Sequence, residues 1–143
     1  MNYLLDTCVI SEYTRREPNL KVIHWMDGHD ESDMFLSTIT MGEIKKGIEQ
    51  LPGDSRRKLA LTAWLNDELL ERFSGRIYSI TTEVMLHWVS LYARLESSGQ
   101  TISTMDLLIA AIALSYHTVL VTHNEDHFRP TGIELINPWK AQD

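Results

Sequence analysis

Short apolar segments rich in β-branched residues alternate along the chain with longer segments whose apolar residues recur every three or four positions. The short segments predict strands and the longer ones predict helices. Strands that alternate with helices are typical of an α/β fold with a mostly parallel sheet. The predicted strands are Tyr3–Leu5, 34–39, 76–80, 118–122 and 133–136, and the predicted helices are 22–28, 42–51, 56–73, 83–95 and 107–114.

The length and composition fit a single domain. A chain of 143 residues, 43% of them hydrophobic, has the usual size of one domain and can bury a real core. The stretch 52–55, Pro-Gly-Asp-Ser, predicts a turn and not a domain linker. The sequence has no apolar run near the roughly 18 residues that span a bilayer. Because the N-terminus lacks a basic region and the single Cys8 cannot form an internal disulfide, we expect a cytoplasmic protein.

The formal net charge of −7 gives little indication about a nucleic-acid partner. Proteins that bind nucleic acids are usually basic, because contacts with phosphates supply much of the affinity. An acidic chain can still bind RNA where bound cations or a basic patch offset its charge locally. The candidate patches are Arg15-Arg16, Lys45-Lys46 and 56–58, and each of them is also consistent with a solvated helix face.

Carboxylates stand where the apolar segments end. Asp6 follows the first predicted strand, Glu43 is expected to open the helix after the second strand, and Asp106 lies in the first turn of an alanine-rich helix. Asn124 follows the fourth predicted strand. In open α/β sheets the binding crevice lies outside the carboxyl ends of the strands. We therefore expect side chains that are distant in sequence to meet in one crevice at that edge.

Carboxylates that converge need a counter-charge. Two of them 4 Å apart repel by about 4 kcal/mol at an effective dielectric constant near 20. Hard oxygen ligands favour Mg²⁺ or Mn²⁺ over Zn²⁺, and Mg²⁺ binds through one or two carboxylates together with a substrate phosphate. The pattern therefore favours metal-assisted hydrolysis of a phosphodiester, in which the ion lowers the pKa of a water and stabilises charge on the phosphate.

The same acids also fit helix caps. Thr40 and Glu43, like Ser103 and Asp106, stand in the capping-box spacing before an apolar helix. Asp6 fits the N-cap of a helix that follows the first strand. The two interpretations do not exclude each other, because an acid in the first turn of a helix can face a crevice while its neighbour caps.

Three further groups suggest alternative chemistry. His123 and His127 are four positions apart and could share a helix face as zinc ligands, but no cysteine or further histidine has matching spacing, so a solvent-facing or RNA-contacting pair is the favoured interpretation. Cys8 could act as a nucleophile, but a small buried hydrophobic side chain is the simpler interpretation. The hydroxyl of Thr7 could hold a metal-bound water or Asp6, or it could cap a helix, and the sequence leaves these choices open.

Several blocks of the sequence resemble PIN domains, in familiar order and spacing. Residues 3–12, YLLDTCVISE, resemble the opening of these domains, in which a strand delivers an Asp followed by Thr or Ser. Residues 37–48, STITMGEIKKGI, resemble the second block, and residues 105–113, MDLLIAAIA, the third. Residues 120–128, LVTHNEDHF, resemble the fourth. The ending 134–139, ELINPW, is similar to the VapC and FitB branch of bacterial toxin–antitoxin nucleases.

The resemblance implies a single PIN domain over residues 1–143, with a PIN-like three-layer fold in which a five-stranded parallel sheet is flanked by helices. It implies an Mg²⁺-dependent endoribonuclease that hydrolyses phosphodiester bonds in single-stranded or looped RNA, as the toxin of a type II toxin–antitoxin system. One or two Mg²⁺ ions, or Mn²⁺ in their place, would bind Asp6, Glu43 and Asp106. A cognate antitoxin and a homodimer are the partners usual in this branch.

The fourth acidic position departs from the family pattern. The acid found there in many PIN domains aligns with the neutral Asn124, and the Asp that other relatives place before the last Phe aligns with His127. Asp126 or Glu125 could substitute, although neither is in register, while the carbonyl of Asn124 could still orient a water or contact the ion. This departure favours a second interpretation, a non-catalytic PIN-fold binding or scaffold module, which the three retained acids oppose.

Overall fold

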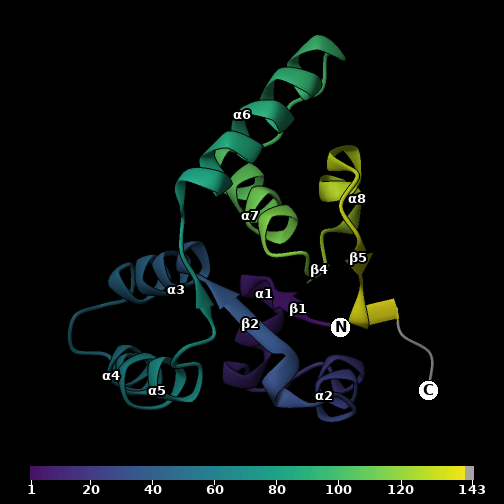
Figure 1. Ribbon diagram of the computed structural model, residues 1–143. Helices are drawn as coiled ribbons and strands as arrows, with labels where there is room; N and C mark the ends of the chain where they lie inside the picture. Colours follow the sequence, from purple (N-terminus) through teal and green to yellow (C-terminus); the bar gives the residue numbers. More distant parts are fainter. Residues whose placement is uncertain (141–143) are drawn as a thin grey trace.

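Five parallel strands form one sheet, in the order β3-β2-β1-β4-β5 (Figure 1). The computed structural model describes residues 1–140. Helices connect the strands and cover both faces of the sheet, which gives three layers. The predicted α/β fold with a five-stranded parallel sheet is therefore confirmed.

The strands lie within the five predicted apolar segments. They are β1 (Tyr3–Leu5), β2 (Met34–Ser37), β3 (Ile77–Tyr78), β4 (Val119–Val121) and β5 (Leu135–Ile136). The α-helices are α1 (Thr7–Ile10), α2 (Leu20–Asp27), α3 (Thr38–Glu49), α4 (Arg56–Ala63), α5 (Leu70–Arg72), α6 (Thr82–Ser97), α7 (Thr104–Ser115) and α8 (Glu125–Phe128). Short 3-10 turns are η1 (Ser11–Thr14), η2 (Glu31–Asp33), η4 (Arg129–Thr131) and η5 (Pro138–Lys140), and η3 (Trp64–Leu69) is a π-helical turn. Within residues 1–140, no helix combines the length and the apolar character that crossing a membrane requires.

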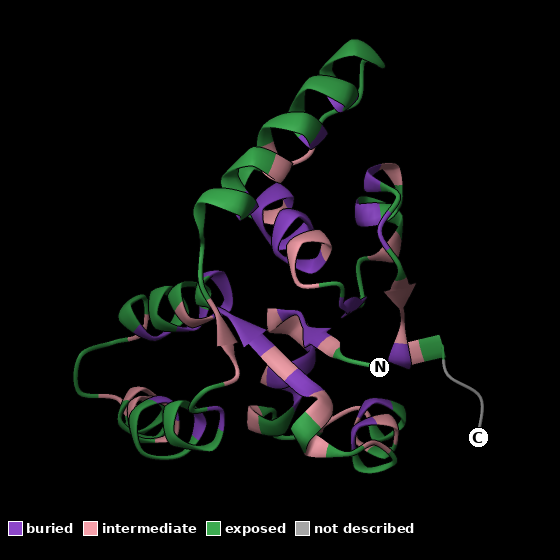
Figure 2. Ribbon diagram, viewed as in Figure 1, coloured by how far each residue is buried: buried purple, intermediate pink, exposed green. Residues whose placement is uncertain are grey.

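The sheet lies between two apolar cores, because successive residues of an inner strand point to opposite faces. Leu4 and Leu120 belong to the core that α6 and α7 cover, whereas Leu5 and Val121 belong to the core on the side of α1, α2 and α3. Helix α7 is buried without interruption over 107–113. Helix α6 packs against α7 and leaves its other side exposed (Figure 2).

Helices α3 and α7 start four and three residues earlier than the sequence predicts, and α2 and α6 start two residues and one residue earlier. Helix α3 begins at Thr38, because the hydroxyl of Ser37 accepts a hydrogen bond from the amide of Thr40 at 3.2 Å and caps the helix there. Helix α7 begins directly after its cap, Ser103. The predicted helix 56–73 is confirmed as α4, η3 and α5 in direct succession.

The order of the strands reverses between β1 and β4. From β1 the chain adds β2 and β3 on one side, and it then crosses the sheet to add β4 and β5 on the other side. At such a switch point the connections that leave the two neighbouring strands go to opposite sides and leave a crevice at the carboxyl edge. The residues that follow β1 and β4 are therefore the ones placed to line a binding site.

Candidate active site

Asp6 directly follows β1, at the switch point, and is only 6% exposed. Its Oδ1 atom accepts a hydrogen bond from the amide of Thr7 at 2.8 Å, and its Oδ2 atom accepts one from the hydroxyl of Thr122 at 2.8 Å. The first bond caps α1, so the N-cap interpretation of Asp6 is confirmed. The second bond joins the end of β1 to the residue that follows β4. One carboxylate therefore starts a helix and also lies where the crevice opens.

The surroundings of Asp6 disfavour its negative charge. Burial is the largest cause that raises the pKa of this carboxyl. The hydrogen bonds from Thr122 and Thr7 lower the pKa in part, while the negative charges of Glu43 and Asp106 raise it further. Both of the other predicted acids thus lie within electrostatic reach of Asp6.

Glu43 lies inside α3, which corrects the prediction that it opens this helix. The capping-box interpretation of Thr40 and Glu43 is wrong, because Ser37 is the cap. The Oε1 atom of Glu43 instead accepts a hydrogen bond from the hydroxyl of Thr7 at 2.7 Å, and this hydroxyl also lies 3.2 Å from Oγ1 of the buried Thr40. The Thr7 hydroxyl therefore holds Glu43, a contact that the sequence did not predict, and its contact with a metal-bound water stays a prediction.

Asp106 lies in the first turn of α7, as predicted. The hydroxyl of Ser103 accepts a hydrogen bond from the Asp106 amide at 3.2 Å and donates one to Oδ2 of Asp106 at 2.9 Å, so this capping pair is confirmed. The same Oδ2 atom lies 2.8 Å from Nε2 of His127, which comes from α8. Asp106 is therefore held from two elements, although its side chain stays 28% exposed.

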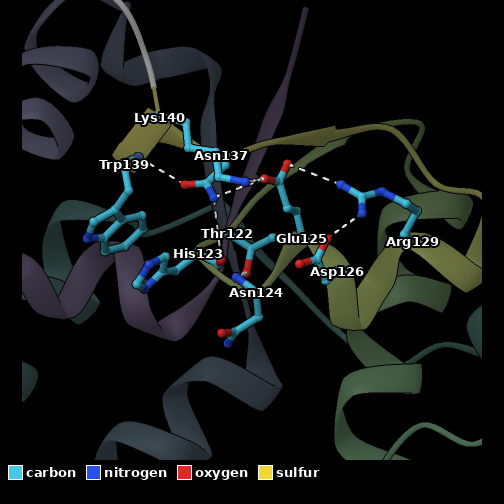
Figure 3. A network of polar contacts seen from close by, with 9 residues as sticks. All are labelled: Thr122, His123, Asn124, Glu125, Asp126, Arg129, Asn137, Trp139 and Lys140. Carbon is cyan, nitrogen blue, oxygen red and sulfur yellow. Dashed lines mark hydrogen bonds and ion pairs between the residues drawn. The ribbon is translucent and has the colours of Figure 1, made fainter.

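The segment that follows β4 carries the residues considered for the fourth acidic position (Figure 3). Asn124 is exposed and stands at the N-cap of α8, where its side chain makes no capping hydrogen bond. The side chain of Asp126 is 83% exposed and pairs with Arg129. The Oε1 atom of Glu125 accepts hydrogen bonds from Nζ of Lys140 at 2.5 Å and from Nδ2 of the Asn137 side chain at 3.3 Å. The two neighbouring acids are thus engaged with basic or amide groups.

The chemistry of the three crevice acids fits a hard divalent cation. They are oxygen ligands at one sheet edge, and one of them is desolvated with a raised pKa, a condition that a bound cation relieves. As placed, Glu43 is engaged by Thr7 and Asp106 by His127. Within residues 1–140, no three Asp, Glu, His or Cys side chains are gathered closely enough to hold a metal ion. Joint binding would therefore require Glu43 and Asp106 to rotate away from these partners.

The alternative zinc and cysteine sites receive no support from the geometry. The His123 ring stacks on Trp139, whereas Nε2 of His127 lies 2.8 Å from Oδ2 of Asp106. The two histidines therefore contact different partners. Cys8 is partly buried, and burial is the main cause that raises the pKa of its thiol to about 11. Cys8 is therefore a protonated thiol at neutral pH, which agrees with a structural role and not with a nucleophile.

Sequence reasoning missed two residues that support the crevice acids. Thr122 is completely buried and donates to Asp6, and its hydroxyl also accepts a hydrogen bond from the Asn124 amide at 3.0 Å. Nothing in the sequence indicated that His127 contacts Asp106. A signal for Thr122 was present in the sequence, because it is a polar residue directly after the apolar run Val119–Val121.

The family model described as PIN domain matches residues 3–133. The chain belongs to the PIN domain family. Relatives of this PIN domain include the plasmid stability protein StbB of Pseudomonas syringae pv. tomato, which is 38% identical over 96% of this chain and 99% of the relative. The Toxin FitB of Neisseria gonorrhoeae is 32% identical over 95% of this chain and 97% of the relative. The VapC ribonuclease Y4jK of Sinorhizobium fredii is 31% identical over 96% and 97%.

The PIN fold is also similar to a solved structure, that of FitAB bound to an IR36 DNA fragment. The TM-score is 0.92 at 30% identity, and the match covers 99% of this chain and 98% of the other. Together with the relatives, this likeness confirms the resemblance to the VapC and FitB branch of PIN domains.

Proposed function

We propose that this PIN domain is an Mg²⁺-dependent endoribonuclease that acts as the toxin of a toxin–antitoxin pair. The observation that carries the proposal is the buried Asp6 at the switch point, with Glu43 and Asp106 near enough to raise its pKa. Such a group of acids destabilises a fold unless a cation offsets their charge. The names of the relatives, VapC ribonuclease and Toxin FitB, support this chemistry and this biological role.

In this proposal Asp6, Glu43 and Asp106 hold the ion, which polarises the phosphate and supplies a water of lowered pKa when it is bound. Asp6 defines the position of the site, because two hydrogen bonds fix its carboxylate before any ligand arrives. Thr7 orients Glu43, and His127 orients Asp106. Joint binding of an ion by all three acids would require Glu43 and Asp106 to exchange these contacts for the ion, whereas Asp6 is already in place.

RNA is the proposed substrate, and a basic groove supports this despite the net negative charge. Nη1 of Arg57 donates a hydrogen bond to the carbonyl of Thr14 at 3.0 Å, which joins Arg57 to the basic residues Arg15 and Arg16 in one groove. Arg57, from a second candidate patch, thus lines the same groove as Arg15 and Arg16. Glu17 also lines this groove, and Arg15 pairs with Glu12. The arginines of this groove are the proposed contacts for phosphates. Asn124 is exposed beside the crevice and is the proposed contact for a bound water or for RNA.

A cognate antitoxin is the proposed protein partner. FitB is named a toxin, and the similar solved structure is that of FitAB. An acidic crevice suits an inserted basic side chain, because charge-assisted hydrogen bonds to carboxylates are strong. Co-purification with the product of a short neighbouring gene tests this. Harmless expression without that product, combined with full nuclease activity of the purified protein, would contradict it.

A homodimer is the second proposed assembly, formed through α6. This helix exposes the apolar side chains of Met85, Leu86, Val89 and Tyr92, a grouping that favours a protein contact. Light scattering of Leu86→Glu tests the surface, and Leu59→Glu on α4 is the matched control because the two leucines are equally exposed, at 65% and 64%. We expect the dimer to be lost only with Leu86→Glu. Retention of the dimer in both variants contradicts a contact through α6.

The decisive assay for the function uses the purified protein, a structured RNA, and Mg²⁺, Mn²⁺ or EDTA. We expect cleavage with either ion and none in EDTA. Because the proposed nucleophile is a water and not the ribose 2′-hydroxyl, the products should carry a 5′-phosphate and a 3′-hydroxyl. Cleavage that persists in EDTA, or that leaves a 2′,3′-cyclic phosphate, would rule out this mechanism.

A further inference from the structure

A stacked aromatic pair lies beside the crevice and has no part in the proposed metal chemistry. The rings of His123 and Trp139 lie face to face, with centroids 4.2 Å apart and planes inclined by 12° (Figure 3). Trp139 packs against the core on the side of α2, where η5 contacts this helix. His123 is exposed. One face of the ring of this exposed residue is thus covered by an anchored indole.

The backbone around this pair is fixed by side chains. The amide of His123 donates to Sγ of Cys8 at 3.5 Å, and the carbonyl of His123 accepts a hydrogen bond from Nδ2 of Asn137 at 3.4 Å. Oδ1 of Asn137 in turn accepts a hydrogen bond from the amide of Trp139 at 3.0 Å. Asn137 therefore links the two aromatic residues and sets the position of both. A ring held in this way loses little conformational entropy when a ligand stacks on it.

The backbone of His123 is joined to Asp6 by two short chains of contacts. His123 follows Thr122, whose hydroxyl donates to Oδ2 of Asp6 at 2.8 Å. The amide of His123 donates to Sγ of Cys8 at 3.5 Å, and this sulfur lies 3.8 Å from the same Oδ2 atom. The segment that carries the aromatic pair is therefore anchored beside the buried acid.

We propose that His123, backed by Trp139, is a stacking subsite for an RNA base next to the phosphate that is cleaved. This proposal rests on the proposed function and adds a substrate contact to it. Proteins that bind single-stranded RNA stack unpaired bases on aromatic side chains, histidine included. Such stacking tolerates all four bases, because every base has a π-face. The subsite would thus select for an unpaired base and against a duplex, without reading a particular sequence.

A purely structural role for the pair makes a different prediction. If Trp139 and His123 serve only to hold η5 in place, their replacement should change the affinity for every ligand equally, whether or not that ligand carries bases. The test must therefore compare two ligands that share one backbone, of which one carries bases and the other carries none. It must also avoid cleavage, which EDTA prevents under the proposed mechanism.

The experiment measures the affinity of the full chain in EDTA for two fluorescent nonamers, an oligoadenylate and an oligomer of abasic residues, by anisotropy. We expect His123→Ala to weaken the binding of oligoadenylate by roughly tenfold or more and to leave binding of the abasic oligomer unchanged. His123→Phe keeps a flat ring and should retain the affinity for oligoadenylate. His24→Ala, which removes an exposed histidine on α2, is the matched control and should change neither affinity.

Several outcomes would overturn the stacking subsite. His123→Ala could weaken the affinity for both oligomers equally, or leave the affinity for oligoadenylate unchanged. The wild type could have no affinity for oligoadenylate. His123→Phe could lose the affinity for oligoadenylate while its melting temperature stays that of the wild type. None of these results decides the proposed nuclease function, which depends on cleavage in Mg²⁺. If the wild type does not cleave RNA but His123→Ala selectively weakens oligoadenylate, the nuclease proposal fails while the base contact stands.

Discussion

Asp6 and Asp106 bring the same functional group to one crevice from opposite environments. Asp6 is 6% exposed and is held by the Thr7 amide and the Thr122 hydroxyl, both of which the sheet and α1 fix in place. The side chain of Asp106 is 28% exposed and is held by the side chains of Ser103 and His127. The fold therefore fixes the position of the Asp6 carboxylate. The position of the Asp106 carboxylate depends instead on two side chains, Ser103 and His127, that can rotate. The following changes test this contrast, from the largest expected effect to the smallest.

Replacing Asp6 should have the largest effect. Asp6→Asn removes the charge and keeps the shape, so RNA cleavage in Mg²⁺ should fall by several orders of magnitude as the metal's contribution is lost. The free energy of unfolding should hold or rise, because repulsion from Glu43 and Asp106 is relieved. Asp54→Asn, in the exposed turn after α3, is the matched control and should change neither quantity. Cleavage rates and urea unfolding measure both; a variant with wild-type activity contradicts the assignment of Asp6.

Removing the hydroxyl of Thr122 should have the next largest effect. Thr122→Val deprives the buried Asp6 carboxylate of a hydrogen bond, which should lower the free energy of unfolding by about 1–3 kcal/mol. Thr118→Val is the control, since this buried hydroxyl meets only a backbone carbonyl, at 3.4 Å. Urea unfolding at neutral pH in EDTA compares the variants. An equal loss of unfolding free energy in Thr122→Val and Thr118→Val would contradict a stabilising contribution specific to the bond with Asp6.

The pH dependence of stability in EDTA should report the burial of Asp6. Its pKa in the folded protein is raised from the ordinary value of 3.8, mainly by burial, so the folded state binds this proton more tightly than the unfolded state. The stability from this group is therefore complete below the ordinary pKa and is lost as the pH rises through the folded pKa. We expect the stability of the wild type relative to Asp6→Asn to fall as the pH rises above 3.8. A difference that stays constant with pH would contradict the raised pKa.

Replacing Asn124 should have the smallest effect. Its side chain is exposed and makes no capping hydrogen bond with α8, so Asn124→Ala should leave the melting temperature unchanged. Cleavage should fall by much less than in Asp6→Asn, because the position lacks the charge that holds a cation. Steady-state cleavage of one RNA by both variants gives the comparison. A loss as large as that of Asp6→Asn would assign Asn124 to the metal site itself.

The apolar pattern allowed much of the fold to be predicted. All five strands lie within predicted segments, because β-branched runs alternate with helical periodicity along the whole chain. The start of α3 was missed: Ile39 extends the apolar pattern of β2 beyond Ser37, although the Ser37 hydroxyl ends the strand and begins the helix. Local patterns cannot decide between these readings when a polar cap is followed by another apolar residue.

The site was predicted in part for a similar reason. Asp6 and Asp106 could be placed from their positions beside a strand and a helix, since such positions follow from the local sequence. The contacts of Thr122 with Asp6 and of His127 with Asp106 depend on which strands and helices become neighbours in space. This information belongs to the order of the strands and not to any single segment.

The bond between Thr122 and Asp6 has a consequence for the synthesis of the protein. The two residues are 116 positions apart, so the carboxylate leaves the ribosome long before the hydroxyl that becomes its partner. At ordinary elongation rates the delay is on the order of ten seconds. Nascent chains and truncated products that end before β4 lack the second wall of the crevice. A cell that makes this protein therefore meets an assembled site only after β4 and Thr122 have been synthesised.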